Sequence, residues 1–223
     1  KRDGSIFPEQ MTVMAEVAKF CRERQAIVHH AQSVPQIALL FSTAAHYRMI
    51  NGLFSRNNAR VAGVLQALLE TQQAVDVVTE AQLAGRLADY PLIVVPEWQY
   101  LEPAFKADLV TYTKNGGRLL LIGPRTAALF QPELGITLEG VATANTSLYL
   151  GPANAPQVVT GDRQAVTLGA GAAPRGELRA NSDPATPAQP AASITTLGRG
   201  QIAATYFSFA ISYQQTPNPA ARD

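Results

Sequence analysis

The sequence is poor in the residues that most often build disulfides and metal centres. It contains one cysteine and three histidines among 223 residues. One cysteine excludes a disulfide within the chain, and the histidines lack the HxxxH or HxH spacing of a metal site, so no metal and no cofactor are expected. Cys21 lies at helical spacing from Met14 and Val17, which predicts a buried side chain rather than a reactive thiol.

Charge and hydrophobicity exclude two further classes of partner. The 18 basic and 17 acidic residues give a net charge of +1, and no run of Lys and Arg is long enough to follow a phosphate backbone. No apolar run approaches the roughly 20 residues that a membrane helix needs, and the opening KRDGSIFPEQ lacks the apolar centre of a signal peptide. We expect neither nucleic acid nor a membrane as partner. The compartment stays open between periplasmic, secreted and cytoplasmic locations.

Apolar strands and amphipathic helices alternate through the first half of the sequence. Four short apolar runs have the length and composition of buried strands, at Gln36–Ser42, Ala74–Val78, Leu92–Val95 and Arg118–Ile122. Helices are predicted around them, at Pro8–His29, 58–69, 79–87 and Pro103–Lys114, with a polar loop at Thr43–Asn57. Short connections favour right-handed crossovers, and therefore an α/β fold with a doubly wound, mostly parallel sheet flanked by helices.

The composition changes in the second half, where Gly, Pro, Ala and Thr dominate from Gln131 onward. Short strands are predicted there at 146–150, 157–159, 192–197 and 201–207. The last two are separated by Gly198, Arg199 and Gly200, which is typical of a hairpin. This part is predicted to form a β-rich C-terminal extension of the α/β domain.

Turns that bind phosphate or activate a nucleophile are missing from the predicted strand ends. Ser42 and Thr43 follow the first strand, where dinucleotide binding needs a glycine-rich turn and a receiver domain needs acidic residues. The fourth strand ends at GPRT (123–126), where a hydrolase of this layout would place its nucleophile at a sharp turn. Neither a cysteine nor a GxSxG motif is found there, and Thr126 is a weak candidate.

Several polar and aromatic side chains are predicted at the carboxyl ends of the strands, the edge where open α/β sheets bind ligands. The candidate ligand-facing residues are His46, Tyr47, Arg48, Glu97, Trp98 and Arg125. An acid beside an aromatic ring suits a sugar, because the carboxylate can bind hydroxyl groups and the ring can stack. Alternatively, Trp98 packs beneath its loop or against a partner, and His46 is structural or exposed. A glycosidase needs two facing carboxylates, and Glu97 has no evident second, so no catalytic residue is assigned.

Four segments carry a resemblance to a known family: PQIALLFS, NNARVAGVLQALLETQQAVDVVTE, YPLIVVPEWQYLEPAFKADLVTYTKNGGRLLLIG and LGRGQIAATYFSF. They resemble the class I glutamine amidotransferase-like fold, which is flavodoxin-like. The resemblance is to its degenerate form, the middle, trimerisation-type domain of certain bacterial β-galactosidases and related multidomain glycoside hydrolases. It covers about Gln36 to Ser212. The strand, proline, helix, Gly-Gly-Arg, strand motif is shared with sugar-processing proteins similar to trehalose-utilisation proteins.

The resemblance implies a domain without its own chemistry. Active amidotransferases place a cysteine at the elbow with a histidine downstream, but Cys21 precedes the first strand and no histidine follows His46. Phe7 to His30 resembles the last helix of a catalytic barrel. Together with the start at Lys1 and the end in NPAARD, this suggests a piece of a longer polypeptide. The expected organisation is a helix and linker at 1–34, the amidotransferase-like domain at 35–212 and a tail at 213–223.

We therefore expect a non-catalytic accessory or oligomerisation domain of a multidomain glycoside hydrolase. The expected partners are other domains of the same polypeptide and further copies of the chain, with carbohydrate as a candidate ligand. The alternative is a stand-alone sugar-binding module or small-molecule hydrolase that uses the strand-end face around His46 and Glu97. A third interpretation is an interaction domain outside carbohydrate metabolism.

Overall fold

The computed structural model describes residues 4–34, 36–49, 58–215, 218 and 220. The chain separates into two units, Lys1–Val34 and Pro35–Asp223. Among the described residues, no helix combines the length and the hydrophobicity that a membrane span requires.

The first unit is built around one helix, α1 (Pro8–Val28). Pro8 occupies its first turn, where the fixed φ of proline suits a helix start. The predicted helix is therefore confirmed. The predicted burial of Cys21 is wrong, because α1 buries none of its side chains and Cys21 is exposed. Met14 and Val17, on the same face, are 61% and 57% exposed.

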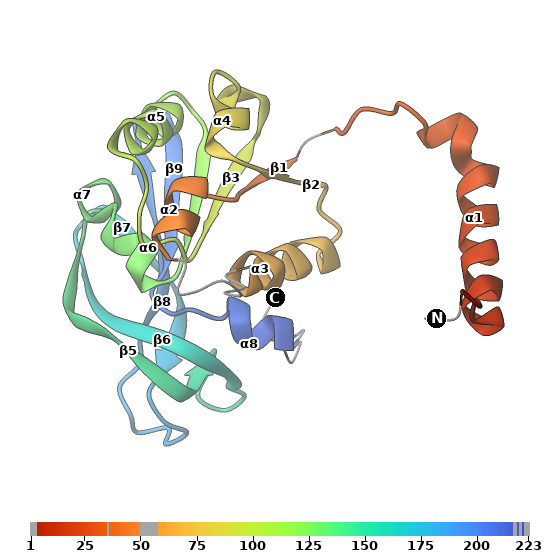
Figure 1. The fold of residues 1–223 in the computed structure, drawn as a ribbon. Helices are drawn as coiled ribbons and strands as arrows, with labels where there is room; N and C mark the ends of the chain where they lie inside the picture. Colours follow the sequence, from red (N-terminus) through yellow and green to blue (C-terminus); the bar gives the residue numbers. More distant parts are fainter. Residues whose placement is uncertain (1–3, 35, 50–57, 216–217, 219, 221–223) are drawn as a thin grey trace. The chain divides into compact units, whose positions relative to one another are not determined.

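Among the described residues, nine strands of the second unit form one sheet, ordered β2-β1-β3-β4-β9-β8-β7-β5-β6 (Figure 1). The strands are β1 (Ile37–Leu40), β2 (Val75–Val78), β3 (Leu92–Pro96), β4 (Arg118–Ile122), β5 (Ile136–Leu150), β6 (Gln157–Leu168), β7 (Ala172–Arg179), β8 (Gln189–Leu197) and β9 (Gly200–Thr205). From β2 to β9 the neighbours run parallel, and the remaining pairs are antiparallel.

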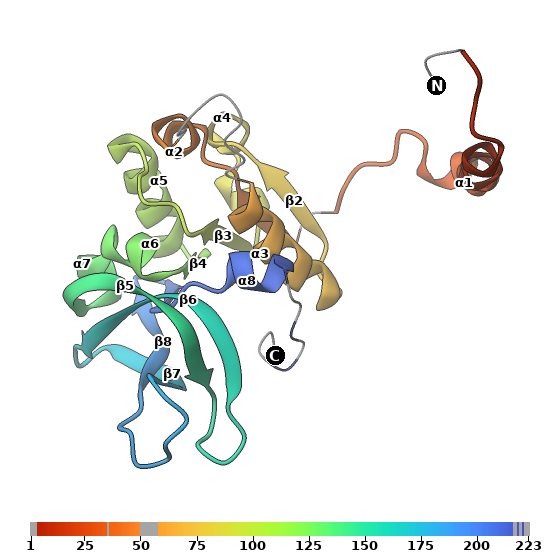
Figure 2. The same cartoon turned by 60° about the horizontal axis from the view of Figure 1, so that its bottom comes forward.

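The sheet is thus mixed, which confirms the α/β class but not the predicted mostly parallel, doubly wound arrangement. The predicted C-terminal extension is instead part of the same sheet, because β9 pairs parallel with β4 and antiparallel with β8. The β8–β9 hairpin is confirmed. β7 was not predicted, since its sequence AAPRGELR lacks the apolar alternation of a typical strand. Figure 2 shows β5 and β6 as a long curved ribbon.

Helices cover both faces of the parallel strands. The described helices of the second unit are α2 (Thr43–Arg48), α3 (Ala59–Glu70), α4 (Glu80–Leu83), the 3-10 turn Leu87–Asp89, α5 (Pro103–Lys114), α6 (Pro124–Ala128), α7 (Gln131–Leu134) and α8 (Ala210–Gln215). The step from β1 to β2 and the step from β3 to β4 run in opposite directions across the sheet. Right-handed crossovers therefore place α3 and α5 on opposite faces, as Figure 2 shows.

Several predicted bounds differ from the structure. β5 begins at Ile136 rather than at 146, β6 ends at Leu168 rather than at 159, and α4 ends at Leu83 rather than at 87. Thr43–Arg48 is helical rather than part of a polar loop, and the rest of that predicted loop, 50–57, lies outside the described residues. The helix forms because the Ser42 hydroxyl accepts a hydrogen bond from the Ala45 N–H at 3.1 Å, as an N-cap residue does. The boundary predicted after residue 212 falls inside α8, where Tyr213 is buried.

The Gly-Gly-Arg motif has a packing role. Gly116 has φ of 114°, a backbone conformation that favours glycine, and it turns the chain from α5 into β4. A Cβ added at Gly117 would lie 2.2 Å from Cζ of Tyr112. The tyrosine ring therefore fits only because glycine has no side chain. The Tyr112 hydroxyl then donates to the Tyr90 carbonyl at 2.8 Å. The motif thus serves the contact between α5 and the sheet.

α3 and α8 lie side by side in both views (Figures 1 and 2) and contact each other closely. A Cβ added at Gly63 of α3 would lie 1.8 Å from the carbonyl oxygen of Ala210 in α8. Such a distance is far inside van der Waals contact. Gly63 therefore sets the separation of the two helices.

We predict that Gly63→Ala destabilises the chain by about 1–3 kcal/mol or more, since backbone atoms must move to admit the methyl group. The gain in helix propensity, at most about 1 kcal/mol, is too small to offset this. Urea unfolding of the chain measures the change. Gly171→Ala is the matched control, because a Cβ there meets nothing within 4 Å. Equal stability of the two variants would contradict the close approach.

Candidate functional site

The six predicted ligand-facing residues come from three elements at the carboxyl ends of β1, β3 and β4. His46, Tyr47 and Arg48 lie on α2, Glu97 and Trp98 follow β3, and Arg125 lies on α6. No cavity described for the placed residues is lined by all six. Glu97 borders a pocket of about 100 Å³ whose other walls include Arg60, Asp162 and Ser208 rather than the other five predicted residues.

Glu97 is a buried anchor. Its side chain is 6% exposed, and its backbone has φ of 47°, an uncommon conformation for a residue other than glycine. Its Oε1 accepts hydrogen bonds from the backbone N–H groups of Phe209 and Ala210, each at 3.1 Å. Its Oε2 lies 3.4 Å from Nε of Arg60 on α3. One carboxylate thus joins the end of β3 to α3 and to the start of α8.

The environment of Glu97 disfavours its charged form on balance. Burial raises the pKa of its carboxyl above the ordinary value of 4.5. The backbone donor at Ala210, the guanidinium of Arg60 and the donor at Phe209 oppose that rise, and the charge of Asp162 adds to it. All these groups belong to the chain itself. Glu97 is therefore engaged by groups of its own chain.

Trp98 is part of the core. It is 0% exposed, and its indole N–H donates to the Leu40 carbonyl at 2.8 Å. Its ring meets Phe41 edge-on at a centroid distance of 5.8 Å. Its backbone carbonyl accepts a hydrogen bond from the Thr126 hydroxyl at 2.9 Å. A fully buried indole cannot stack on a sugar.

The side chains of the turn after β4 also make contacts within the chain. Gly123 has φ of 88°, and Thr126, the sole hydroxyl of the GPRT segment, is 0% exposed. Arg125 points from α6 to the ribbon, where its Nε lies 3.0 Å from Oδ2 of Asp162 on β6. Its side chain is about half exposed at 48%. Here the sharp turn holds a salt bridge and a core contact.

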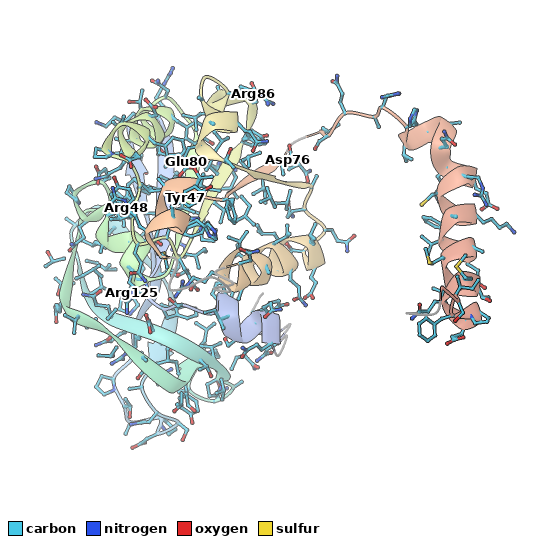
Figure 3. All side chains as sticks on the ribbon, viewed as in Figure 1. Tyr47, Arg48, Asp76, Glu80, Arg86 and Arg125 are labelled. Carbon is cyan, nitrogen blue, oxygen red and sulfur yellow. The ribbon has the colours of Figure 1, made fainter. Side chains whose placement is uncertain are left out.

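α2 carries the exposed members of the set. His46 is partly buried, and among the described residues its Nδ1 has no hydrogen-bond partner. Tyr47 is 74% exposed. The guanidinium of Arg48 lies 3.8 Å from the centroid of the Tyr100 ring and 3.9 Å from Oε1 of Glu102. Figure 3 shows Tyr47 and Arg48 on α2, with Glu80 beside them.

Glu80 was not predicted from the sequence, yet it fixes α2. Its carboxylate accepts hydrogen bonds from the Ser42 hydroxyl, from the Thr43 N–H at 2.9 Å and from the Thr43 hydroxyl at 3.0 Å. The signal that could have found it is its place in the first turn of α4, directly after Thr79, the N-cap residue of the predicted Thr79–Gln82 capping box. That box is present, with the Thr79 N–H donating to Oε1 of Gln82 at 2.9 Å.

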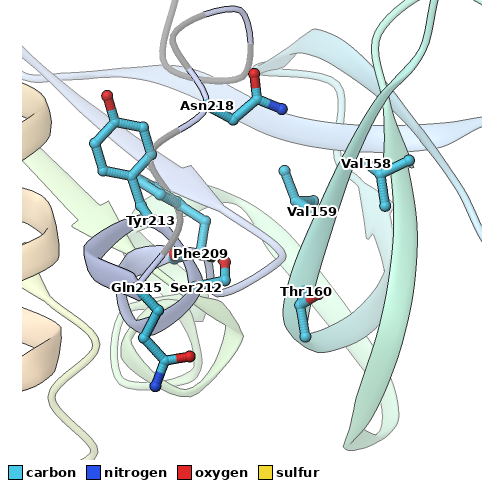
Figure 4. Close-up of a pocket in the computed structure, with 8 residues that line it drawn as sticks. All are labelled: Val158, Val159, Thr160, Phe209, Ser212, Tyr213, Gln215 and Asn218. Atoms are coloured by element: carbon cyan, nitrogen blue, oxygen red, sulfur yellow. Dashed lines mark hydrogen bonds between the residues drawn. The ribbon is translucent and has the colours of Figure 1, made fainter.

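A second pocket of about 330 Å³ lies between β6 and α8 (Figure 4). Its walls combine the aliphatic side chains of Val158 and Val159 with the aromatic rings of Phe209 and Tyr213. None of the six predicted residues lines it. Among the described residues, no group of three or more His, Cys, Asp or Glu side chains is placed to hold a metal ion.

The fold of this chain is similar to part of several solved glycosidase structures. The β-galactosidase from Rahnella sp. R3 has a TM-score of 0.68 and 19% identity, over 91% of this chain and 33% of that one. The α-L-fucosidase isoenzyme 2 from Paenibacillus thiaminolyticus has a TM-score of 0.69 and 17% identity, over 92% of this chain and 34% of that one. The β-galactosidase from Bacillus circulans sp. alkalophilus has a TM-score of 0.64 and 14% identity, over 90% of this chain and 32% of that one. The chain therefore spans about a third of these proteins.

A family model narrows the comparison. The model described as the β-galactosidase trimerisation domain matches residues 25–134, a little under half of the chain. No curated protein sequence matches the chain significantly. The solved structures, each under 25% identical to this chain, show a shared fold, and the family model adds a sequence likeness to a β-galactosidase trimerisation domain over residues 25–134.

The raised pKa of Glu97 predicts a pH dependence of stability. The folded state binds this proton more tightly than the unfolded state, so the contribution of Glu97 to stability is largest below the ordinary pKa of 4.5 and falls as pH rises through the folded-state pKa. Glu97→Gln keeps an acceptor oxygen and does not titrate. The stability of the native chain minus that of the variant should therefore fall with pH, by at most about 1.4 kcal/mol per pH unit.

Urea unfolding of both proteins across the range from acidic to neutral pH measures that difference. The comparison cancels the titration of every other group that the substitution leaves unchanged. An increase of the difference with rising pH would show that Glu97 is held as a favoured carboxylate instead, and would contradict the assignment.

The burial of Trp98 predicts a shielded fluorophore, and the chain has no other tryptophan. Acrylamide should quench the emission of the folded chain far less steeply than that of the chain in denaturing urea, because quenching requires collision with the indole. Galactose should leave the emission unchanged. Steep quenching of the folded chain would place the indole at the surface and restore Trp98 as a candidate sugar contact.

Proposed function

We propose that this chain is an oligomerisation domain of a multidomain glycoside hydrolase and contributes no catalytic group to it. The observation that carries the proposal is the match of residues 25–134 to a family described as the β-galactosidase trimerisation domain. The partners of the chain would be further copies of itself and other domains of the same polypeptide. Hydrolysis would be performed by those other domains.

The state of the strand-end edge supports this role. Glu97 and Trp98 are 6% and 0% exposed, and both bind groups of the chain itself. The two residues best suited to bind a sugar are thus inaccessible to one. This weakens the alternative of a stand-alone sugar-binding module on this face. Carbohydrate as a ligand of this edge is therefore not supported by Glu97 and Trp98.

We further propose that the second unit is a degenerate relative of the glutamine amidotransferase-like fold. The support is local: β4 ends in a turn with φ of 88° at Gly123, as a nucleophile elbow would, and Pro124 follows. The hydroxyl of Thr126 is sealed in the core. On this interpretation 35–212 forms the domain, 1–34 connects it to a preceding domain, and 213–223, which begins within α8, leads onward.

The proposal predicts self-association without catalysis. Light scattering of the 223-residue chain should give a mass that rises with concentration toward three times 23.8 kDa. Nitrophenyl galactoside, fucoside and mannoside should not be hydrolysed by the same preparation. A chain that stays monomeric at every concentration, or one that hydrolyses a glycoside, would overturn the proposal.

A further inference from the structure

We infer that the outer face of α2 contacts a second copy of this chain. We call this surface the α2 face and define it by Tyr47 and Arg48 of α2 with Tyr100 and Glu102, which lie between β3 and α5. The inference rests on the proposed oligomerisation role and assigns a surface to it.

The position of exposed apolar side chains selects the α2 face. The segment that matches the trimerisation family ends at residue 134. Within the described part of the second unit up to that residue, the exposed large hydrophobic side chains are Tyr47 at 74%, Leu69 at 51% and Val77 at 44%. Tyr47 is the largest and most exposed of the three. Burial of such a side chain against another chain is favourable by the hydrophobic effect.

The chemistry of the α2 face suits a protein interface. Tyrosine and arginine are enriched in interfaces and among the residues that contribute most to binding. Arg48 stacks on Tyr100 at 3.8 Å and pairs with Glu102 at 3.9 Å, yet its side chain stays 60% exposed. The guanidinium is therefore held in place while much of its surface is open to a partner. Two aromatic rings and one ion pair offer both apolar and polar contacts.

The α2 face is also held in position before any partner binds. A helix of six residues is too short to be stable alone. Glu80 accepts three hydrogen bonds from Ser42 and Thr43, and the Ser42 hydroxyl caps Ala45. Fixing a surface in advance lowers the conformational entropy lost on association.

The geometry favours a protein partner over a small ligand. Ligand sites are concave and enclose most of their ligand, whereas Tyr47 projects with three quarters of its surface in solvent. A closed ring of three subunits uses head-to-tail contacts, in which one surface meets a different surface of the neighbour. The α2 face need not be self-complementary, and one such contact per subunit suffices to close the ring.

Sedimentation velocity of the 223-residue chain at several concentrations tests the inference. Tyr47→Ala and Arg48→Ala should each raise the dissociation constant by about tenfold or more, as truncation of dominant interface residues does. Val141→Ala is the matched control, since Val141 is 78% exposed on β5, outside the matched segment. It should leave the constant unchanged. Thermal unfolding by circular dichroism checks that each variant folds, which the exposure of these side chains leads us to expect.

The outcomes separate the two proposals. If the native chain associates and both α2 variants associate equally well, the α2 face is not the interface, and the oligomerisation role stands. The same conclusion holds if Val141→Ala weakens association as much as Tyr47→Ala. If the native chain is monomeric throughout, the proposed function fails, and the inference fails with it.

Discussion

The carboxylate of Glu97 is the interaction on which the strand-end edge depends. It accepts hydrogen bonds from two backbone N–H groups at the start of α8, and it forms an ion pair with the guanidinium of Arg60 on α3. These contacts bring α8 against α3, where Gly63 permits the helices to approach. The buried charge and the backbone φ of 47° are both costly, so the surrounding structure must stabilise them. Such costs often mark a catalytic group, but here every nearby partner belongs to the fold.

The same edge shows how a sheet of this kind can exist without a ligand. The Trp98 indole donates a hydrogen bond to the Leu40 carbonyl, and the Thr126 hydroxyl donates one to the Trp98 carbonyl. Arg125 forms a salt bridge with Asp162 of β6. Among the described residues, Glu97, Trp98 and Arg125 thus each have a partner within the chain. Tyr47 of α2 stays 74% exposed at this edge, and a side chain that projects so far into solvent does not form the enclosed, concave site that a small molecule needs. The packing and the proposed assembly role are therefore two aspects of one arrangement.

Much of the parallel half could be predicted from the sequence, because continuous apolar runs such as LIVVP and strong end signals such as Pro103 and Gly116 depend on neighbours in the chain. The rest depends on partners far away in sequence. β7 is recognisable only beside β8, and α2 is held by Glu80, which lies on α4 after the next strand of the chain. The sequence left open whether Glu97 and Trp98 face a ligand or pack inside the fold, because nothing local reveals that α8 and Leu40 cover them. Cys21 shows the converse, since helical spacing predicts a face but not whether anything packs on it.

The place of β9 in the sheet bears on how the chain can be made. β9 lies between β4 and β8, so the strand synthesised last occupies the middle of the sheet. While the ribosome is still producing residues 136–197, β4 has one edge without its permanent neighbour, and an open edge of buried strands can pair wrongly. The parallel core and the antiparallel ribbons can be joined into one sheet only when residues 200–205 have emerged. Vectorial synthesis thus defers completion of this domain almost to its final residues.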